Sequence, residues 1–534
     1  MAVAYCEVEA LRELLASPAV YAVLDVRERG EFALQQIPDT TPLARGTLEY
    51  RVQRMVPRRD IPITVLCDDG RRSALAAATL RAMGYVHVQV VRGGLQAWVA
   101  RGWPTREGWG VGGKAYGERV AVEQAVPQVN AEELAARRAR GEPVVVVDVR
   151  TAEEFLRGHV PAAYHIPGGN LPREIGWLVD RLDAPIVVSC AGRTRGILAA
   201  QLLREAGFTQ VAALRNGAMG WRLAGLPLEE GPGRGRPAPR PSTLVPALEA
   251  ATARLAAAEG LRRITLDELD ALQAAEAPYY LVDIRLPEEY AAGHPLGAIN
   301  LPAGQLALHY ENHLAVRRAT VVLVGDDPVR PVWAAALCQR LGFPDVRLLD
   351  GGLAAWTAAG RALERGDGVP EAFGLAAARA RVPALTAPAL AARLAAGPGA
   401  PLVLDVRGSG EFGVGHIPGA RWLARGKLEL LVETLVPDRA TPLVTVCDTG
   451  VRAALAAATL AEHGYRDVAY LDGGLAAWRA AGLPLAEGLD GADVSVAEAQ
   501  NDFGHTLWSG ALGRSRRDME RYLTWEERLA HERR

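Results

Sequence analysis

The chain repeats one set of landmarks four times along its 534 residues. Each copy has an Asp-x-Arg element at the end of an apolar run, a six-residue turn that begins 42 residues after that Asp, and a tryptophan 31 residues further on. The Asp-x-Arg elements are Asp25/Arg27, Asp148/Arg150, Asp283/Arg285 and Asp405/Arg407, and the tryptophans are Trp98, Trp221, Trp356 and Trp478. Unrelated segments would not keep both spacings, so the chain is a tandem array of one kind of domain.

The turn begins with cysteine in three of the four copies. Its sequences are CDDGRR (67–72), CAGRTR (190–195), GDDPVR (325–330) and CDTGVR (447–452). Each follows a β-branched run and opens an Ala/Leu-rich helical stretch, so backbone N–H groups and the helix dipole should converge on the sulfur. Such a setting lowers a cysteine pKa from about 8.5 to roughly 3.5–7.5. A packing role would explain one such cysteine, whereas three in register favour thiolate nucleophiles at Cys67, Cys190 and Cys447.

The other residues of these loops are the candidates for substrate binding. A Gly permits the backbone angles that a cradle needs, and the closing Arg either adds a positive charge or braces the loop. These candidates are Gly192, Arg193, Thr194 and Arg195 in the second loop, Gly70, Arg71 and Arg72 in the first, and Gly450 and Arg452 in the fourth. The second loop has two arginines and no acid, so we expect it to attract a dianion most strongly. Asp68 and Asp448 should raise the thiol pKa and repel anions in the other two.

These motifs resemble those of the rhodanese family of sulfurtransferases. The resemblance rests on Asp-Val-Arg, Glu-Phe, GHIPGA (415–420), Cys-x4-Arg and GGL-x-AW (93–98 and 473–478), and it spans nearly the whole chain. It implies an α/β fold of four tandem rhodanese-like domains, each a mainly parallel sheet flanked by helices. It also implies a thiolate that takes a sulfane sulfur from thiosulfate or a related donor as a persulfide. Cyanide or a thiol then accepts that sulfur, and no cofactor or metal is required.

The family resemblance extends to two details of the loops. The third domain, with Gly325 in place of cysteine, resembles the inactive domains that family members pair with an active one. The fourth loop is similar to that of mercaptopyruvate sulfurtransferases, from which it differs at Asp448 and Arg452. Phosphatases of the same fold have a longer Cys-x5-Arg loop, which argues against a phosphatase. A non-catalytic sulfur carrier or binding scaffold is the alternative function.

The repeats divide the chain into domains with connecting segments. We expect rhodanese-like domains at 1–110, 127–230, 262–366 and 381–488, a linker plus helix at 231–261, and a C-terminal tail with a helix at 489–534. The Pro/Gly/Arg-rich stretch from Glu229 to Ser242 is expected to divide the chain into two halves. The first and fourth repeats are the most alike, with 11 of 16 positions identical between 65–80 and 445–460. The tail offers Met519, Tyr522, Leu523 and Trp525 as an apolar face, which we expect to dock on a domain rather than form a dimer contact.

Other landmarks have structural interpretations. The Asp-x-Arg element and the Glu four residues later should form an ion pair beneath the loop, and His159, His294 and His416 should be hydrogen-bonded structural groups. Arg45 and Arg425 lie either at the surface or near an anionic substrate.

Composition limits the remaining possibilities. A formal net charge of −2 argues against nucleic-acid and membrane-surface binding. Five scattered cysteines form no disulfide framework or metal-ligand spacing, and the N-terminus has no signal-peptide pattern. The expected setting is the cytoplasm, and the expected partners are a small-molecule sulfur donor and a thiol or cyanide acceptor. A homodimer remains open.

Overall fold

The computed structural model describes residues 3–502 and 515–531, and in it the chain forms two compact units. Unit 1 contains residues 3–109, 312–317 and 369–502, and unit 2 contains residues 110–311, 318–368 and 515–531. The first and fourth repeats therefore share unit 1, and the second and third share unit 2. The expected division of the chain at 229–242 is wrong, because this segment lies inside unit 2.

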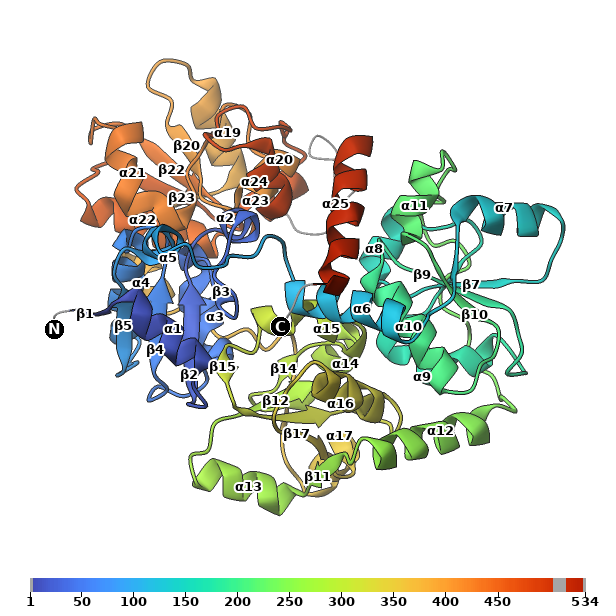
Figure 1. Ribbon diagram of the computed structural model, residues 1–534. Coiled ribbons are helices and arrows are strands. Elements are labelled where there is room, and N and C mark those ends of the chain that lie inside the picture. Colours follow the sequence, from blue (N-terminus) through green and yellow to red (C-terminus); the bar gives the residue numbers. More distant parts are fainter. Residues whose placement is uncertain (1–2, 503–514, 532–534) are drawn as a thin grey trace. The chain divides into compact units, whose positions relative to one another are not determined.

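Unit 1 contains the first and fourth repeats, coloured blue and orange to red in Figure 1. Its strands are β1 (Ala4–Cys6), β2 (Tyr21–Asp25), β3 (Thr41–Pro42), β4 (Ile63–Leu66), β5 (Val88–Val91), β15 (Val316–Arg317), β19 (Ala384–Leu385), β20 (Leu402–Asp405), β21 (Arg421–Trp422), β22 (Leu443–Val446) and β23 (Val468–Leu471). Its α-helices are α1 (Val8–Ala16), α2 (Arg29–Leu34), α3 (Leu48–Met55), α4 (Arg71–Ala82), α5 (Gly94–Ala100), α18 (Leu375–Arg381), α19 (Ala387–Ala395), α20 (Ser409–Val414), α21 (Leu428–Leu435), α22 (Val451–Glu462), α23 (Gly474–Ala480) and α24 (Val496–Asp502).

Unit 2 contains the second and third repeats and the last helix. Its strands are β6 (Gln128–Val129), β7 (Val145–Asp148), β8 (Tyr164–His165), β9 (Ile186–Ser189), β10 (Val211–Leu214), β11 (Arg262–Ile264), β12 (Tyr279–Asp283), β13 (His294–Pro295), β14 (Ile299–Asn300), β16 (Thr320–Val324), β17 (Val346–Leu349) and β18 (Leu363–Glu364). Its α-helices are α6 (Val111–Glu123), α7 (Ala131–Ala139), α8 (Ala152–Arg157), α9 (Leu171–Glu174), α10 (Thr194–Glu205), α11 (Gly217–Leu223), α12 (Val245–Ala258), α13 (Leu266–Ala274), α14 (Pro287–Ala292), α15 (Leu306–His309), α16 (Arg330–Arg340), α17 (Gly352–Ala358) and α25 (Arg516–Arg528).

The four main sheets have the same strand order, which confirms the expected α/β fold. The orders are β1-β5-β4-β2, β6-β10-β9-β7-β8, β11-β17-β16-β12-β14 and β19-β23-β22-β20-β21, and the neighbours in them pair in parallel. The first sheet also takes β3 in parallel and β15 antiparallel against β2. In each sheet the strand before the loop lies between two others, so the loop emerges from the middle of the carboxyl edge, where α/β sheets bind ligands.

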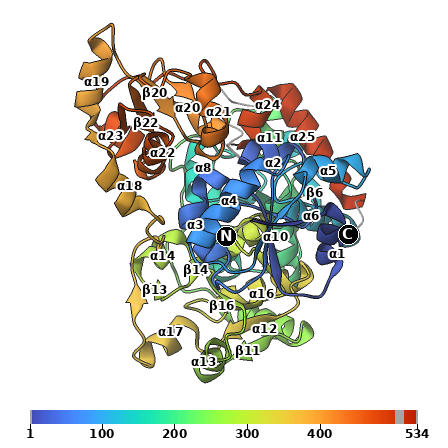
Figure 2. The same ribbon diagram turned by 90° about the vertical axis from the view of Figure 1, so that its left-hand side faces the viewer.

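Helices cover both faces of each sheet, because its strands are apolar on both sides. In the fourth repeat, α18 and α22 belong to one buried cluster, whereas α19 and α23 belong to the other. Figure 1 shows α19, α22 and α23 with β20, β22 and β23, and Figure 2 shows α18 next to α22.

The tryptophans and histidines of the repeats are structural, as expected. Each repeat tryptophan is at most 7% exposed and donates its indole N–H to a backbone carbonyl six residues later. Each histidine stacks on the aromatic ring four residues earlier and hydrogen-bonds that residue's carbonyl. The pairs are Phe155/His159, Tyr290/His294 and Phe412/His416.

Arg45 and Arg425 hold the first and fourth repeats together inside unit 1. Arg45 pairs with Glu429, and Arg425 reciprocally pairs with Glu49 at 2.6 Å. Both arginines are 6% exposed. They are therefore neither surface groups nor free cations for a substrate.

Asp502, at the end of α24, adds a further contact between these two repeats. It accepts hydrogen bonds from the backbone N–H groups of Gly30 and Gly410, in the first turns of α2 and α20.

The linker helix and the C-terminal helix are both present in unit 2. Thr252 on α12 accepts a hydrogen bond from the Trp333 indole on α16, and α12 also contacts α9 of the second repeat. Of the expected tail, residues 503–514 and 532–534 lie outside the described part of the chain. In the described residues, no helix has both the length and the apolar character needed to cross a membrane.

Candidate active site

In the first loop, two backbone N–H groups donate to the sulfur of Cys67. They belong to Gly70 and Ser73, at 3.2 and 3.4 Å from Sγ, and the Ser73 hydroxyl lies 3.3 Å from it. Gly70 is the N-cap of α4 and has a left-handed φ of 98°, which favours glycine. The thiol itself is buried, while residues 68–71 are partly or fully exposed. This loop is a cradle that stabilises negative charge on sulfur.

The fourth loop has the same geometry. The N–H groups of Gly450 and Ala453 lie 3.1 and 3.4 Å from the Cys447 sulfur, and Gly450 has a left-handed φ of 90°. Asp448 is 53% exposed at its side chain. Burial raises the pKa of the Cys447 thiol; Arg452 opposes the rise, and Asp448 adds to it.

The second loop has a different conformation. Arg193 stands at the position of Gly70 and has a φ of −122°, and the Cys190 thiol donates to its carbonyl at 3.7 Å. Residues 191–197 are all buried. Burial raises the pKa of Cys190 to about 11; Arg195 and the Gly196 N–H oppose the rise, and Glu526 adds to it. The expected lowering of the thiol pKa is therefore wrong for both Cys190 and Cys447.

The arginines of the second loop are not free cations. Arg193 pairs with Glu118 through two contacts of 2.7 Å and with Glu527 at 2.9 Å. Arg195 pairs with Glu154 at 2.6 and 2.7 Å. The expected surplus of positive charge is therefore wrong in this conformation, because carboxylates from α6, α8 and α25 neutralise it.

The third loop differs from the first and fourth in more than the absence of a cysteine. A Cβ built on Gly325 would lie 2.6 Å from Cγ of Pro331. Pro331 occupies the position of Ser73 and Ala453, and proline has no N–H to donate. Both the space for a cysteine side chain and one donor of the cradle are therefore missing.

The closing arginine of every loop braces it against the upstream glutamate. The pairs are Arg72/Glu31, Arg195/Glu154, Arg330/Glu289 and Arg452/Glu411. The Asp-x-Arg pairs are buried beneath, as expected, but the glutamates contact the loop arginines rather than joining them. Arg71 differs from these braces, because its side chain is 73% exposed and pairs with Asp69.

Arg150 beneath the second loop has a buried donor without a partner. Its counterpart in the first repeat, Arg27, reaches Asp68 Oδ1 at 3.5 Å through Nη1. The residue equivalent to Asp68 is Ala191, and Arg150 Nη1 has no hydrogen-bond partner among the described residues. Since Arg150 is 0% exposed, solvent does not reach this N–H either.

The sequence motifs do not identify three residues that contact the loops, namely Ser73, Glu118 and Glu526. Ser73 could have been found from its place one residue after the loop. Glu118 and Glu526 lie 75 and 332 positions from their loop partners Arg193 and Thr194, and no local pattern connects them.

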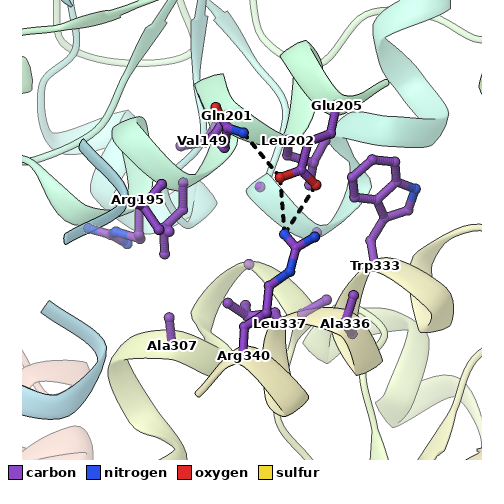
Figure 3. A pocket seen from close by; sticks show the side chains of 18 of the residues that line it. Val149, Arg195, Gln201, Leu202, Glu205, Ala307, Trp333, Ala336, Leu337 and Arg340 are labelled. Carbon is purple, nitrogen blue, oxygen red and sulfur yellow. Dashed lines mark hydrogen bonds and ion pairs between the residues drawn. The ribbon is translucent and has the colours of Figure 1, made fainter. Parts of the chain in front are cut away.

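A cavity of about 430 Å³ lies beside the second loop in unit 2. It is lined mainly by α6, α10 and α16, and Figure 3 shows Arg340 of α16 reaching Glu205 of α10 across it. Arg195 contributes to the lining, but Cys190 is not among the lining residues. The cavity is thus separated from the thiol by the brace of the loop.

Comparison with known proteins identifies the family. The rhodanese-like domain matches four segments, residues 7–101, 130–224, 265–359 and 386–481. A crystal structure of a thiosulfate sulfurtransferase from Pseudomonas aeruginosa is 32% identical, with a TM-score of 0.84, and the match covers 99% of this chain and 97% of that one.

Shorter curated proteins match parts of the chain. A sulfurtransferase of Allochromatium vinosum is 31% identical over 103 residues, which are 19% of this chain and 94% of that protein. A putative thiosulfate sulfurtransferase of Mycobacterium tuberculosis is 28% identical over 271 residues, 41% of this chain and 95% of its own length. An HTH-type transcriptional regulator of the same species is 42% identical over 101 residues, 18% of this chain and 43% of its own length.

The four matched segments make up more than half of the chain, and each contains one of the four loops. The relatives include several sulfurtransferases. The protein therefore belongs to the rhodanese family and carries four rhodanese-like domains in a single chain.

Proposed function

We propose that the protein is a sulfurtransferase that moves a sulfane sulfur from thiosulfate, or a related donor, through a cysteine persulfide to cyanide or a thiol. The observation that carries this proposal is the pair of backbone N–H groups on the sulfur of both Cys67 and Cys447. These donors stabilise negative charge, first on the thiolate and then on the terminal sulfur of the persulfide.

The reaction balances without an added oxidant or cofactor. After the thiol proton leaves to solvent, the thiolate attacks the sulfane sulfur of thiosulfate. A new S–S bond forms to cysteine, the original S–S bond breaks, and sulfite leaves with the electron pair. Cyanide then attacks the outer sulfur of the persulfide, so that thiocyanate departs and the thiolate returns.

The loop residues have distinct roles in this proposal. The main chain of Gly70 and Gly450 binds the charged sulfur. Arg72 and Arg452 hold the loops in shape through Glu31 and Glu411.

The charges around the loops determine how donors approach. Arg71 is exposed and binds an anionic donor at the first loop by exchanging its pairing with Asp69. In the second loop, Gly192, Arg193, Thr194 and Arg195 bind a donor to Cys190 once the Glu526 and Glu527 carboxylates of the last helix are displaced. All five cysteines are free, which suits a reducing compartment such as the cytoplasm.

Cysteine variants test the proposal directly. Replacing Cys67, Cys190 and Cys447 together by serine should reduce thiosulfate-to-cyanide transfer by at least about 1000-fold, since no nucleophile remains in any loop. Cys338→Ser is the control, because this cysteine lies on α16 and belongs to none of the four loops, so its replacement should leave activity within about twofold. Undiminished activity in the triple variant would disprove the mechanism.

A carrier or scaffold role is the second candidate, and unit 2 favours it. Its third loop has no nucleophile, and its second loop is covered. Under this alternative the protein would form persulfides at stoichiometric amounts but release them to cyanide far more slowly than they form. Single-turnover and steady-state rates measured on the same sample separate the two functions.

A further inference from the structure

The C-terminal helix α25 covers the second loop. Met519 and Leu523 on this helix are 4% and 5% exposed, and a Cβ built on Gly192 would lie 3.8 Å from the Leu523 side chain. Lys114 of α6 is 2% exposed and lies 5.0 and 4.9 Å from the ring centres of Tyr522 and Trp525. The helix is therefore docked through its apolar face, in agreement with the expectation from the sequence.

The docked helix brings a carboxylate within hydrogen-bonding distance of donor groups of the loop. Glu526 is 2% exposed, and its Oε1 accepts hydrogen bonds from Thr194 Oγ1 at 2.6 Å and from Thr194 N–H at 3.4 Å. Thr194 is the first residue of the 12-residue helix α10, so the carboxylate lies at the positive end of that helix.

Two polar atoms at this loop have no partner among the described residues. Oε2 of Glu526 is buried and would lie 3.3 Å from a Cβ built on Gly192. The other atom is Nη1 of Arg150, beneath the loop. A carboxylate has only two oxygens, and both lie in one plane. It therefore accepts hydrogen bonds from only some of the N–H and O–H groups that an anion with three oxygens could reach.

We propose that the second loop is a binding site for a sulfonate-type dianion such as thiosulfate, and that Glu526 occupies this site in competition with it. The Thr194 N–H and hydroxyl, together with Arg193 and Arg150, would donate to the oxygens of the ligand. Binding then displaces Glu526 and with it α25. The inference rests on the proposed function for its choice of ligand, whereas the anion site itself does not.

This arrangement also controls the nucleophile. While the helix is docked, burial and the Glu526 charge both keep the Cys190 proton in place. A bound dianion that removes the helix exposes the loop to water and frees Arg193 from Glu527. Cys190 thus becomes reactive only when a donor of suitable charge is present.

The test uses the full chain with Cys67→Ser and Cys447→Ser, so that Cys190 is the one loop nucleophile. Glu526→Gln should lower the KM for thiosulfate by about tenfold and leave kcat within about threefold, because the competing charge is gone. Leu523→Ala should lower KM in the same direction by loosening the helix without changing the loop. Glu520→Gln is the matched control, since this residue lies on the same helix but pairs only with Arg516 among the contacts of the described chain, and KM should stay within about twofold.

A second readout detects binding without turnover. Inorganic sulfate should speed the labelling of Cys190 by iodoacetamide, because it displaces the helix, with half of the effect at about tenfold lower concentration in Glu526→Gln than in its parent. In the parent, sulfate should also speed hydrogen exchange of the peptide backbone at 516–528.

Three outcomes are decisive. A higher KM or lost turnover in Glu526→Gln would show that Glu526 assists the reaction, and would overturn the inference. Unchanged hydrogen exchange of 516–528 at saturating sulfate would overturn it as well. If sulfate speeds the labelling of Cys190 and releases the helix but no variant forms a persulfide, the anion site stands and the proposed sulfur transfer at this loop fails.

Discussion

The first and second loops share a motif but surround their cysteine sulfurs with different hydrogen-bonding groups. In the first, two N–H groups donate to the Cys67 sulfur, and the loop residues 68–71 reach solvent. In the second, the Cys190 thiol donates to the carbonyl of Arg193, and residues 191–197 are buried. A strand-to-helix turn with cysteine therefore does not by itself produce a reactive thiolate.

The source of the acidic groups explains this difference. The first loop carries its own acids, Asp68 and Asp69, which pair with Arg72 and Arg71 of the same loop. The second loop has no acid of its own and receives Glu118 from α6 and Glu526 from α25. A helix that moves away takes its carboxylates with it. The second loop can therefore change between a neutralised and a cationic form, whereas the first loop cannot lose its own acids.

The pH dependence of Cys190 should show the largest effect. Below a pKa of about 11 the thiolate fraction grows tenfold per pH unit, so alkylation of Cys190 should rise about 1000-fold from pH 7 to pH 10. The direction follows from burial, which favours the neutral thiol and so raises the pKa. The measurement is iodoacetamide labelling resolved by peptide, with circular dichroism to verify folding at each pH. A plateau near pH 8.5 would mean that the thiol is not held in its protonated form.

Proline at position 73 should give the first loop the same missing N–H donor as the third loop. In a chain that keeps Cys67 alone among the loop cysteines, Ser73→Pro removes one N–H donor and brings a ring against the sulfur. Persulfide formation should fall by about 100-fold or more. Ser73→Ala keeps the N–H and should remain within about tenfold of its parent. Equal rates for the two variants would show that the N–H donor is unimportant.

Separating the loops by cysteine substitution should give an effect of about tenfold. At pH 7.5, kcat/KM for thiosulfate should be at least about tenfold lower in Cys67→Ser/Cys447→Ser than in Cys190→Ser, since Cys190 is covered and protonated. The assay is thiocyanate formation from thiosulfate and cyanide. If the chain that retains only Cys190 is the faster enzyme, the second loop is open in solution and the comparison fails.

The smallest effect concerns the acid that follows Cys447. Asp448 adds to the rise in the pKa of this thiol, so Asp448→Asn should increase alkylation of Cys447 at pH 7.5 by about threefold. Arg452 remains paired with Glu411, which keeps the loop braced. Thr449→Val, at the exposed neighbouring position, is the control and should change little. Slower alkylation of Cys447 in Asp448→Asn would show that Asp448 favours the thiolate and would contradict this prediction.

The sequence predicts most of what lies inside one repeat. Fixed spacings locate the sheets, the loops and the buried Asp-x-Arg pairs, because these depend on local periodicity and on contacts within about 100 residues. The pairing of repeats was not predicted, although the likeness of 65–80 to 445–460 was a usable signal. The sequence does not predict that the second loop is covered and neutralised. Glu118 and Glu527, which pair with Arg193, lie far from it in the chain.

The cysteine on which the persulfide forms distinguishes the open loops from the covered loop most directly. The wild-type protein treated with a small excess of thiosulfate at pH 7.5, digested and mapped by mass spectrometry, should carry an added mass of about 32 Da, one sulfur, on the peptides of Cys67 and Cys447. The Cys190 peptide should carry it to a lesser extent, and more fully in Glu526→Gln. An adduct that forms first on Cys190 of the wild type, or none on Cys67 and Cys447, would contradict the account.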